Sequence, residues 1–120
     1  MNRGRVITSI RSLISIMLSG LITMPVLAEE KAASSVETGK AIALKLCQAC
    51  HTFSGADQAG TTGPPFVSMS QRFPQRKRLQ DIIYDAQKSL KPHTMMPPFG
   101  RHGFVDKQDT KMLIDFLYTL

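Results

Sequence analysis

The residues with the most evident chemistry form the segment Cys47-Gln48-Ala49-Cys50-His51, which contains the only two cysteines of the chain. Two thiols at this spacing, with an imidazole directly after the second, fit three kinds of site. These are a redox-active dithiol, half of a zinc site, and the attachment point of a c-type haem. Each kind of site needs different surroundings, so the rest of the chain must decide between them.

The haem interpretation accounts for the motif best. A structural zinc site needs four ligands, usually from a second Cys or His pair, and His93 and His102 form no such pair. A thioredoxin-like dithiol is expected beside strands, but no segment of this chain alternates with the period of a strand. In a haem site, Cys47 and Cys50 add to the vinyl groups as thioethers and His51 ligates the iron. The sequence therefore predicts one covalently attached haem c.

Residues 1–28 predict a signal peptide. They begin with basic residues, continue as an apolar run from Leu13 that Pro25 interrupts, and end in Val-Leu-Ala, which is a typical cleavage pattern. The run covers 16 residues, fewer than the roughly 20 that span a bilayer. We expect cleavage after about Ala28 and a periplasmic protein that makes no membrane contact after cleavage. An uncleaved anchor is the alternative.

Removal of this leader changes the charge balance. The chain has 15 Lys and Arg against 9 Asp and Glu, but three of the basic residues lie in the leader, which leaves 12 against 9, a formal charge of +3. The run Arg72–Arg78 contributes to this excess and is most simply a solvated face. Since the protein is expected to be exported, we predict no nucleic-acid partner.

The remaining chain predicts a flexible lead-in over residues 29–35 and one small all-α domain over residues 36–120. The pattern at Ser34–Glu37 is that of a capping box, which predicts a helix from there to about Leu46. Apolar residues at helical spacing predict two further helices, the last with Asp106 as its N-cap. They are Leu79, Ile82, Ile83, Ala86 and Leu90 in one helix, and Met112, Leu113, Phe116, Leu117 and Leu120 in the other.

Long loops rich in Gly and Pro connect these helices, and one of them carries the best candidate for the second iron ligand. Met96 precedes Pro97 and Pro98, which restrict its backbone and stiffen the loop. Ligation by His and Met raises the haem potential and suits electron transfer. Met95 is the alternative, and a second histidine stays open. The candidates weighed are Met69, His93, Met95, Met96, His102 and Met112.

Taken together, the first helix, "CQACH", "TGPP", the Met-containing loop and the last helix resemble the class I cytochrome c family. The resemblance implies an all-α fold of three or more helices with long loops around one haem. It implies that Gly39 is the point where the first helix crosses the last, against Phe116. It also implies that the carbonyl of Pro64 accepts the N–H of His51, unless that segment is a simple turn. Ala43 departs from the pattern, because many members have an aromatic residue there.

A narrower resemblance, to the SoxX family of sulfur-oxidation cytochromes, lies in "MPPFG" and "FLYTL". It implies that Met96 is the distal ligand and that the protein is the small subunit of a heterodimer with a larger SoxA-type cytochrome c. That heterodimer acts as an L-cysteine S-thiosulfotransferase, which couples thiosulfate to a cysteine of a sulfur-carrier protein and passes electrons to a small cytochrome c.

No catalytic residue is predicted in this chain itself, because both cysteines are used by haem and no acid–base pair is recognisable. A docking patch for the larger subunit is expected around Phe66, Met69 or Phe99. The alternative function is a free periplasmic electron-shuttle cytochrome c that is not dedicated to sulfur metabolism.

Overall fold

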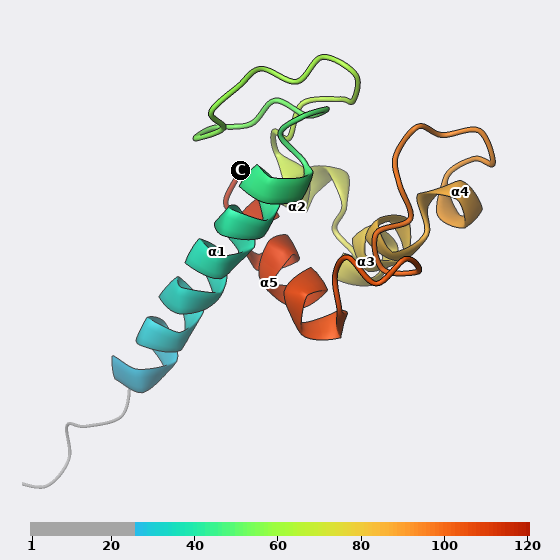
Figure 1. Cartoon of the computed structure of the whole chain (residues 1–120). Helices are drawn as coiled ribbons and strands as arrows, with labels where there is room; N and C mark the ends of the chain where they lie inside the picture. The colour runs from blue at the N-terminus through green and yellow to red at the C-terminus, as the bar shows by residue number, and fades with distance from the viewer. Residues whose placement is uncertain (1–25) are drawn as a thin grey trace, which may run out of the picture.

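In the computed structural model, residues 26–120 are described, with side chains from Glu29 onward. This part of the chain contains five helices and no strand, which confirms the predicted all-α class. The helices are α1 (Val26–Leu46), α2 (Met69–Arg72), α3 (Arg76–Tyr84), α4 (Ala86–Ser89) and α5 (Lys107–Leu117). Long irregular segments separate α1 from α2 and α4 from α5 (Figure 1).

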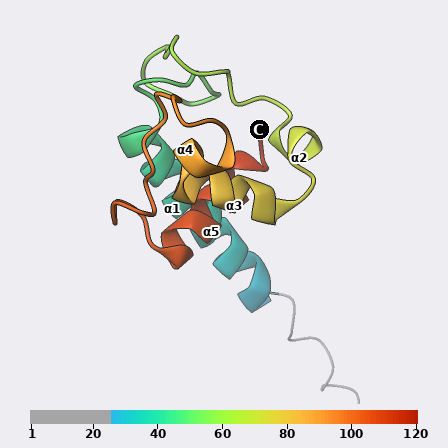
Figure 2. The same ribbon diagram turned by 90° about the vertical axis from the view of Figure 1, so that its right-hand side faces the viewer.

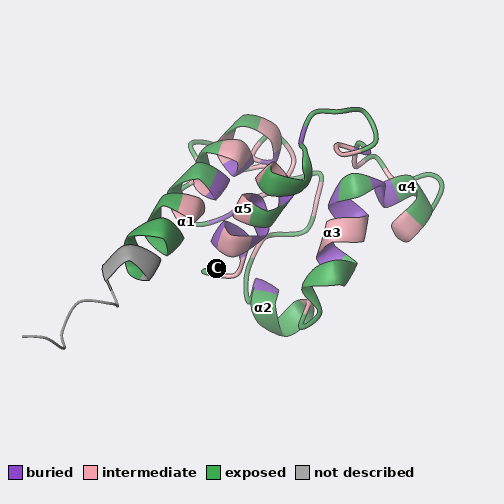
Figure 3. Cartoon of the chain, turned by 90° about the horizontal axis from the view of Figure 1, so that it is seen from below, coloured by how far each residue is buried: buried purple, intermediate pink, exposed green. Residues whose placement is uncertain are grey.

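The helices pack around the crossing of α1 and α5, which lie side by side in both ribbon views (Figures 1 and 2). Gly39 faces the backbone of α5, where a Cβ atom would lie 2.6 Å from the carbonyl carbon of Met112 and 2.9 Å from the Cβ of Phe116. The close approach predicted between Gly39 and Phe116 is therefore present. Residues of α1, α3 and α5 contribute to one core cluster, and Figure 3 marks the buried positions on these helices.

The first helix is longer than the sequence predicted. It runs without interruption from Val26, so residues 29–35, expected as a flexible lead-in, are helical. Ala, Glu and Lys in this stretch favour helix, and nothing ends the helix at Ser34. The capping box predicted at Ser34–Glu37 is not formed, because α1 runs through Ser34, whose carbonyl accepts the hydroxyl of Thr38 at 2.9 Å. The neighbouring Ser35 donates its hydroxyl to Asp115 of α5 at 2.6 Å.

The predicted second helix is interrupted. At Asp85 the backbone leaves the helical region (φ −150°, ψ 88°), which separates α3 from α4. The carboxylate of Asp85 then accepts the backbone N–H of Lys88 and caps α4. Leu79, Ile82, Ile83 and Ala86 are buried as predicted, but Leu90 is half-exposed.

The last helix begins where the sequence predicted and ends earlier than predicted. Asp106 and Asp109 form a reciprocal capping box at its N-terminus. The helix ends at Leu117, three residues before the predicted Leu120, and the carbonyl of Leu120 accepts the backbone N–H of Ser68 at 2.7 Å. The end of the chain is thereby tied to the segment that leads into α2.

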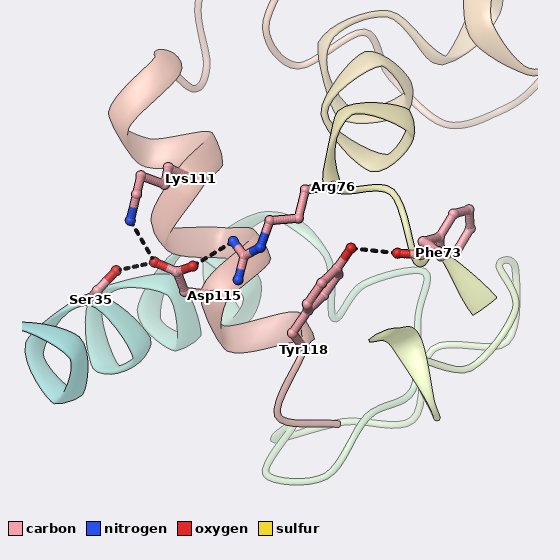
Figure 4. A network of polar contacts seen from close by, with 6 residues as sticks. All are labelled: Ser35, Phe73, Arg76, Lys111, Asp115 and Tyr118. Atoms are coloured by element: carbon pink, nitrogen blue, oxygen red, sulfur yellow. Dashed lines mark hydrogen bonds and ion pairs between the residues drawn. The ribbon is translucent and has the colours of Figure 1, made fainter. Parts of the chain in front are cut away.

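Asp115 connects three helices through one polar network (Figure 4). Its carboxylate accepts bonds from Ser35 of α1 (2.6 Å), Arg76 of α3 (2.6 Å) and Lys111 of α5 (3.0 Å). Partial burial alone would raise the pKa of Asp115, but these three donors outweigh burial and hold the pKa at about 2. The guanidinium of Arg76 also lies 4.6 Å from the ring of Tyr118, whose hydroxyl donates to the carbonyl of Phe73.

The predicted signal peptide lies mostly outside the described residues, which include only its last three positions. Within residues 26–120, none of the helices combines the length and apolar composition needed to cross a membrane.

The α1–α5 crossing generates a direct test. Gly39→Ala should lower the free energy of unfolding by about 2 kcal/mol, because the added methyl overlaps the Met112 backbone and forces the helices apart. The loss should appear although Ala favours helix over Gly by about 1 kcal/mol. Denaturant unfolding of the haem-loaded protein measures it. Thr38→Ala, at the exposed neighbouring position, is the control, and a stabilised Gly39→Ala protein would contradict the close crossing.

Candidate functional site

The two cysteines lie at the C-terminal end of α1, in a tight continuation of the helix. The backbone N–H of Cys47 still donates to the carbonyl of Ala43 (2.8 Å), and the N–H groups of Cys50 and His51 both donate to the carbonyl of Cys47 (3.0 and 2.9 Å). Cys47 is buried and Cys50 half-buried, and both thiols are free. The turn thus presents two thiols and an imidazole from one compact stretch of backbone.

The surroundings of Cys47 do not favour a redox dithiol. Burial, and then the neighbouring Cys50, raise the pKa of Cys47 to about 12. Reactive dithiols have the opposite property, because they use helix N-termini or cationic neighbours to lower the thiol pKa. The zinc alternative has no support in residues 26–120 either, since no three His, Cys, Asp or Glu side chains there could hold a metal ion.

His51 is oriented by the loop that follows it. Its Nδ1 lies 2.8 Å from the carbonyl oxygen of Pro64, the contact expected from the family resemblance. Because a carbonyl oxygen can only accept, Nδ1 carries the proton and the lone pair of Nε2 is left to bind a metal. The ring of Phe66 stacks on the imidazole, with centroids 4.3 Å apart and planes at 20°.

Gly63 lets this loop approach the imidazole. A Cβ atom on Gly63 would lie 2.5 Å from Nδ1 and 2.8 Å from Nε2 of His51, so any larger residue would displace the ring. The backbone N–H of Gly63 also donates to the carbonyl of Cys50 at 2.8 Å. The sequence did not lead us to predict that glycine is required at position 63, although Gly63 directly precedes Pro64.

Burial separates the methionine candidates for the second iron ligand. Met69 is only 2% exposed and belongs to the core, where its sulfur accepts from Arg72 at 3.7 Å. Met95 is 82% exposed, whereas Met96 is half-buried and packs against the core. Met112 lies on α5, with its backbone against Gly39. Of the two adjacent methionines, Met96 is therefore the one held against the core, and the prediction that it ligates the iron remains to be tested.

The two histidines that could compete with Met96 both lie on the surface. His93 and His102 are exposed, and the ring of His102 lies 6.3 Å from that of Phe104. The segment between α4 and α5 begins at the same end of the molecule as the Cys-X-X-Cys-His turn and the loop that follows it (Figures 1 and 2). The fold thus places the favoured methionine loop and the motif at a common end.

The predicted docking residues differ in exposure. Met69 is buried and cannot contact a partner, so this part of the prediction is wrong. Phe66 and Phe99 are half-buried. The large apolar side chains that do reach the surface in the two loops are Val67, Leu90, Met95 and Phe104, which are 53%, 49%, 82% and 61% exposed.

Comparison with known proteins shows which family the chain matches. A family model described as Cytochrome c matches residues 36–120. No curated protein and no solved structure matches the chain. The family match implies a covalently bound haem c, and Cys47 and Cys50 fit its Cys-X-X-Cys-His motif.

The side chains of the Cys-X-X-Cys-His turn and the loop that follows it fit a covalently bound haem c. Both thiols are free for thioether formation, and neither belongs to a disulfide. Nδ1 of His51 contacts the Pro64 carbonyl, so Nε2 is the ring nitrogen available for the iron. Gly63 has no side chain that would displace the ring. A thioether sulfur from Met96, a soft ligand, would complete a donor set that suits haem iron.

Covalent attachment can be tested by solvent extraction. Protein produced with a haem-attachment system should keep its colour in the protein fraction after extraction with acidified acetone. Cys47→Ala and Cys50→Ala should each weaken attachment, because one thioether is lost, and His51→Ala should lose most of the bound haem. Met96→Ala is the control, since it removes no attachment point. Haem released into the solvent from the unaltered protein would contradict covalent binding.

The identity of the distal ligand can be tested by absorption. If Met96 ligates, the oxidised protein should show the weak far-red band of Fe(III)–thioether coordination, and Met96→Ala should abolish it and lower the reduction potential. Met95→Ala is the matched control and should leave both unchanged. The reverse outcome would assign Met95, and a band that persists in both variants would point to Met69 or Met112.

Proposed function

We propose that this chain, which belongs to the cytochrome c family, is the small electron-relay subunit of a thiosulfate-oxidising complex. Family membership makes the chain an electron-transfer haem protein. When bound, haem c supplies a one-electron Fe(III)/Fe(II) couple. The proposed role in thiosulfate oxidation rests on the segments "MPPFG" and "FLYTL", which resemble the SoxX family.

Four residues have proposed roles in attaching the haem and ligating its iron. Cys47 and Cys50 hold the haem as thioethers. His51 binds the iron through Nε2, because its Nδ1 proton is engaged by Pro64. Met96 would supply its thioether sulfur as the second iron ligand. With His51 and Met96 both bound, the iron would keep no position for substrate, so outer-sphere electron transfer is the chemistry that the haem would supply.

This arrangement supports a relay rather than a solitary enzyme. The chain contains two cysteines in total, and haem attachment uses both, which leaves no thiol for sulfur chemistry. Coupling thiosulfate to a carrier cysteine forms an S–S bond and releases an electron pair and a proton. We propose that a larger SoxA-type cytochrome c subunit carries out this step on a sulfur-carrier protein. This chain would take the electrons from that subunit and pass them to a small cytochrome c.

We propose that the larger subunit docks on exposed apolar side chains of the loops that follow α1 and α4. Val67 and Phe104 are each more than half-exposed, and exposed apolar side chains of this size are common at protein interfaces. We also propose a periplasmic location after removal of residues 1–28, on the basis of the basic start and the apolar run.

A reconstituted assay tests the subunit proposal. Oxidised small cytochrome c should be reduced when thiosulfate and the carrier protein are mixed with this chain and the larger subunit together. This chain alone should give no turnover, because it offers no thiol or acid–base pair. An unrelated mono-haem cytochrome c in place of this chain is the control and should support much slower reduction.

The outcomes separate the alternatives. Full turnover by this chain alone would contradict its role as a subunit. Equal turnover with the unrelated cytochrome, or no turnover with the larger subunit present, would favour a free periplasmic electron shuttle that serves no dedicated complex.

A further inference from the structure

Met96 and Phe99 pack against the core, but much of the segment that carries them is exposed, so polar contacts must help to fix its path. Met95 and Phe104 are largely exposed, and Lys91, Pro92 and His93 are exposed as well. Fixed contacts appear just after the methionine, where the chain returns to the end of α3. The backbone N–H of Arg101 donates to the carbonyl of Tyr84 at 3.0 Å.

Gly100 allows this return. A Cβ atom on Gly100 would lie 2.9 Å from the Cα of Tyr84, so only a residue without a side chain can pass so close to the last turn of α3. The contact brings Arg101 next to Asp85, the residue at which α3 ends.

Arg101 then closes a polar cluster that we call the Asp85 anchor, formed by Asp85, Gln87 and Arg101. The Nε of Arg101 pairs with Oδ2 of Asp85 at 3.3 Å, and its Nη2 donates to Oε1 of Gln87 at 2.9 Å. The Asp85 side chain is 8% exposed, whereas that of Arg101 is 48% exposed. Because one partner is buried, loss of the other leaves a carboxylate without its counter-charge, which costs more than the loss of a fully exposed pair.

The segment between the anchor and Met96 is stiff enough to transmit this constraint. Pro97 and Pro98 fix two backbone angles in succession, and Pro98 is buried. The carbonyl of Pro98 accepts the N–H of His102 at 3.0 Å, and the carbonyl of Phe99 accepts the N–H of Phe104 at 2.9 Å. A shift of Arg101 would therefore move the backbone that presents the Met96 sulfur.

We propose that Asp85 and Arg101 are positioning residues that hold the Met96 thioether at its ligand position. The proposal rests on the proposed role of Met96 as the distal ligand. It also gives a reason for the break between α3 and α4: Asp85 ends one helix, caps the next through Oδ1, and keeps Oδ2 for Arg101.

The experiment measures how readily imidazole replaces the distal ligand in the oxidised, haem-loaded protein. Arg101→Gln and Asp85→Asn should each raise the affinity of the ferric haem for imidazole roughly tenfold, the equivalent of about 1.4 kcal/mol. The far-red thioether band should weaken in the same variants. Arg101→Lys keeps the positive charge and should restore part of the wild-type resistance to imidazole.

The chain offers a matched control in its second Asp–Arg pair. Arg76→Gln and Asp115→Asn break the pair between α3 and α5 shown in Figure 4, away from the Met96 segment. They should lower the unfolding temperature but leave the imidazole affinity as in the unaltered protein. This comparison separates positioning of Met96 from a general loss of stability.

The variant Met96→Ala separates the assignment of Met96 as ligand from the positioning role of the Asp85 anchor. It should abolish the far-red band, and if it does not, both the ligand assignment and the role of the anchor are wrong. If it does, but Arg101→Gln and Asp85→Asn bind imidazole no more tightly than Arg76→Gln and Asp115→Asn, then Met96 is the ligand and the anchor does not position it.

Discussion

The close crossing of α1 and α5 is the constraint on which the rest of the structure depends. Gly39 lets the α5 backbone approach, which places Phe116 against Gly39 within α1. Phe116 meets Phe53 edge to face at 5.8 Å, Phe53 stacks on Phe66 at 5.7 Å, and Phe66 stacks on His51 at 4.3 Å. A continuous row of rings therefore links the helix crossing to the imidazole of His51, so a change in the crossing would shift the ring that we propose as an iron ligand.

The position of the cysteines at the C-terminal end of a helix has a second consequence. Burial disfavours a thiolate at Cys47, and burial followed by the charge of Cys50 raises the pKa of Cys47 to about 12. Such a site is poor for thiol redox chemistry, which needs the anion. It is well suited to a thioether, because a thioether carries no charge and loses nothing on burial. The same residues thus favour permanent attachment of a cofactor over reversible chemistry at sulfur.

Much of the site could be predicted from the sequence, because its determinants are local. The Cys-X-X-Cys-His spacing alone places both thiols and the imidazole on one turn. The capping residues at Asp106 and Asp109 mark the start of α5 without any tertiary information. The contacts of Gly39 with Phe116 and of His51 with the Pro64 carbonyl were available from the family resemblance, and both are present.

Other features were decided only by the tertiary structure, since they depend on which partner a side chain finds. Ser34 was predicted to cap a helix, but α1 runs through it, and the adjacent Ser35 donates to Asp115 of α5. Asp85 interrupts an apolar pattern that predicted one helix, because its carboxylate serves both α4 and Arg101. Met95 and Met96 are indistinguishable in type, and only packing buries one and exposes the other. Helical spacing and motifs record local preferences, whereas these choices were set by contacts between residues far apart in the chain.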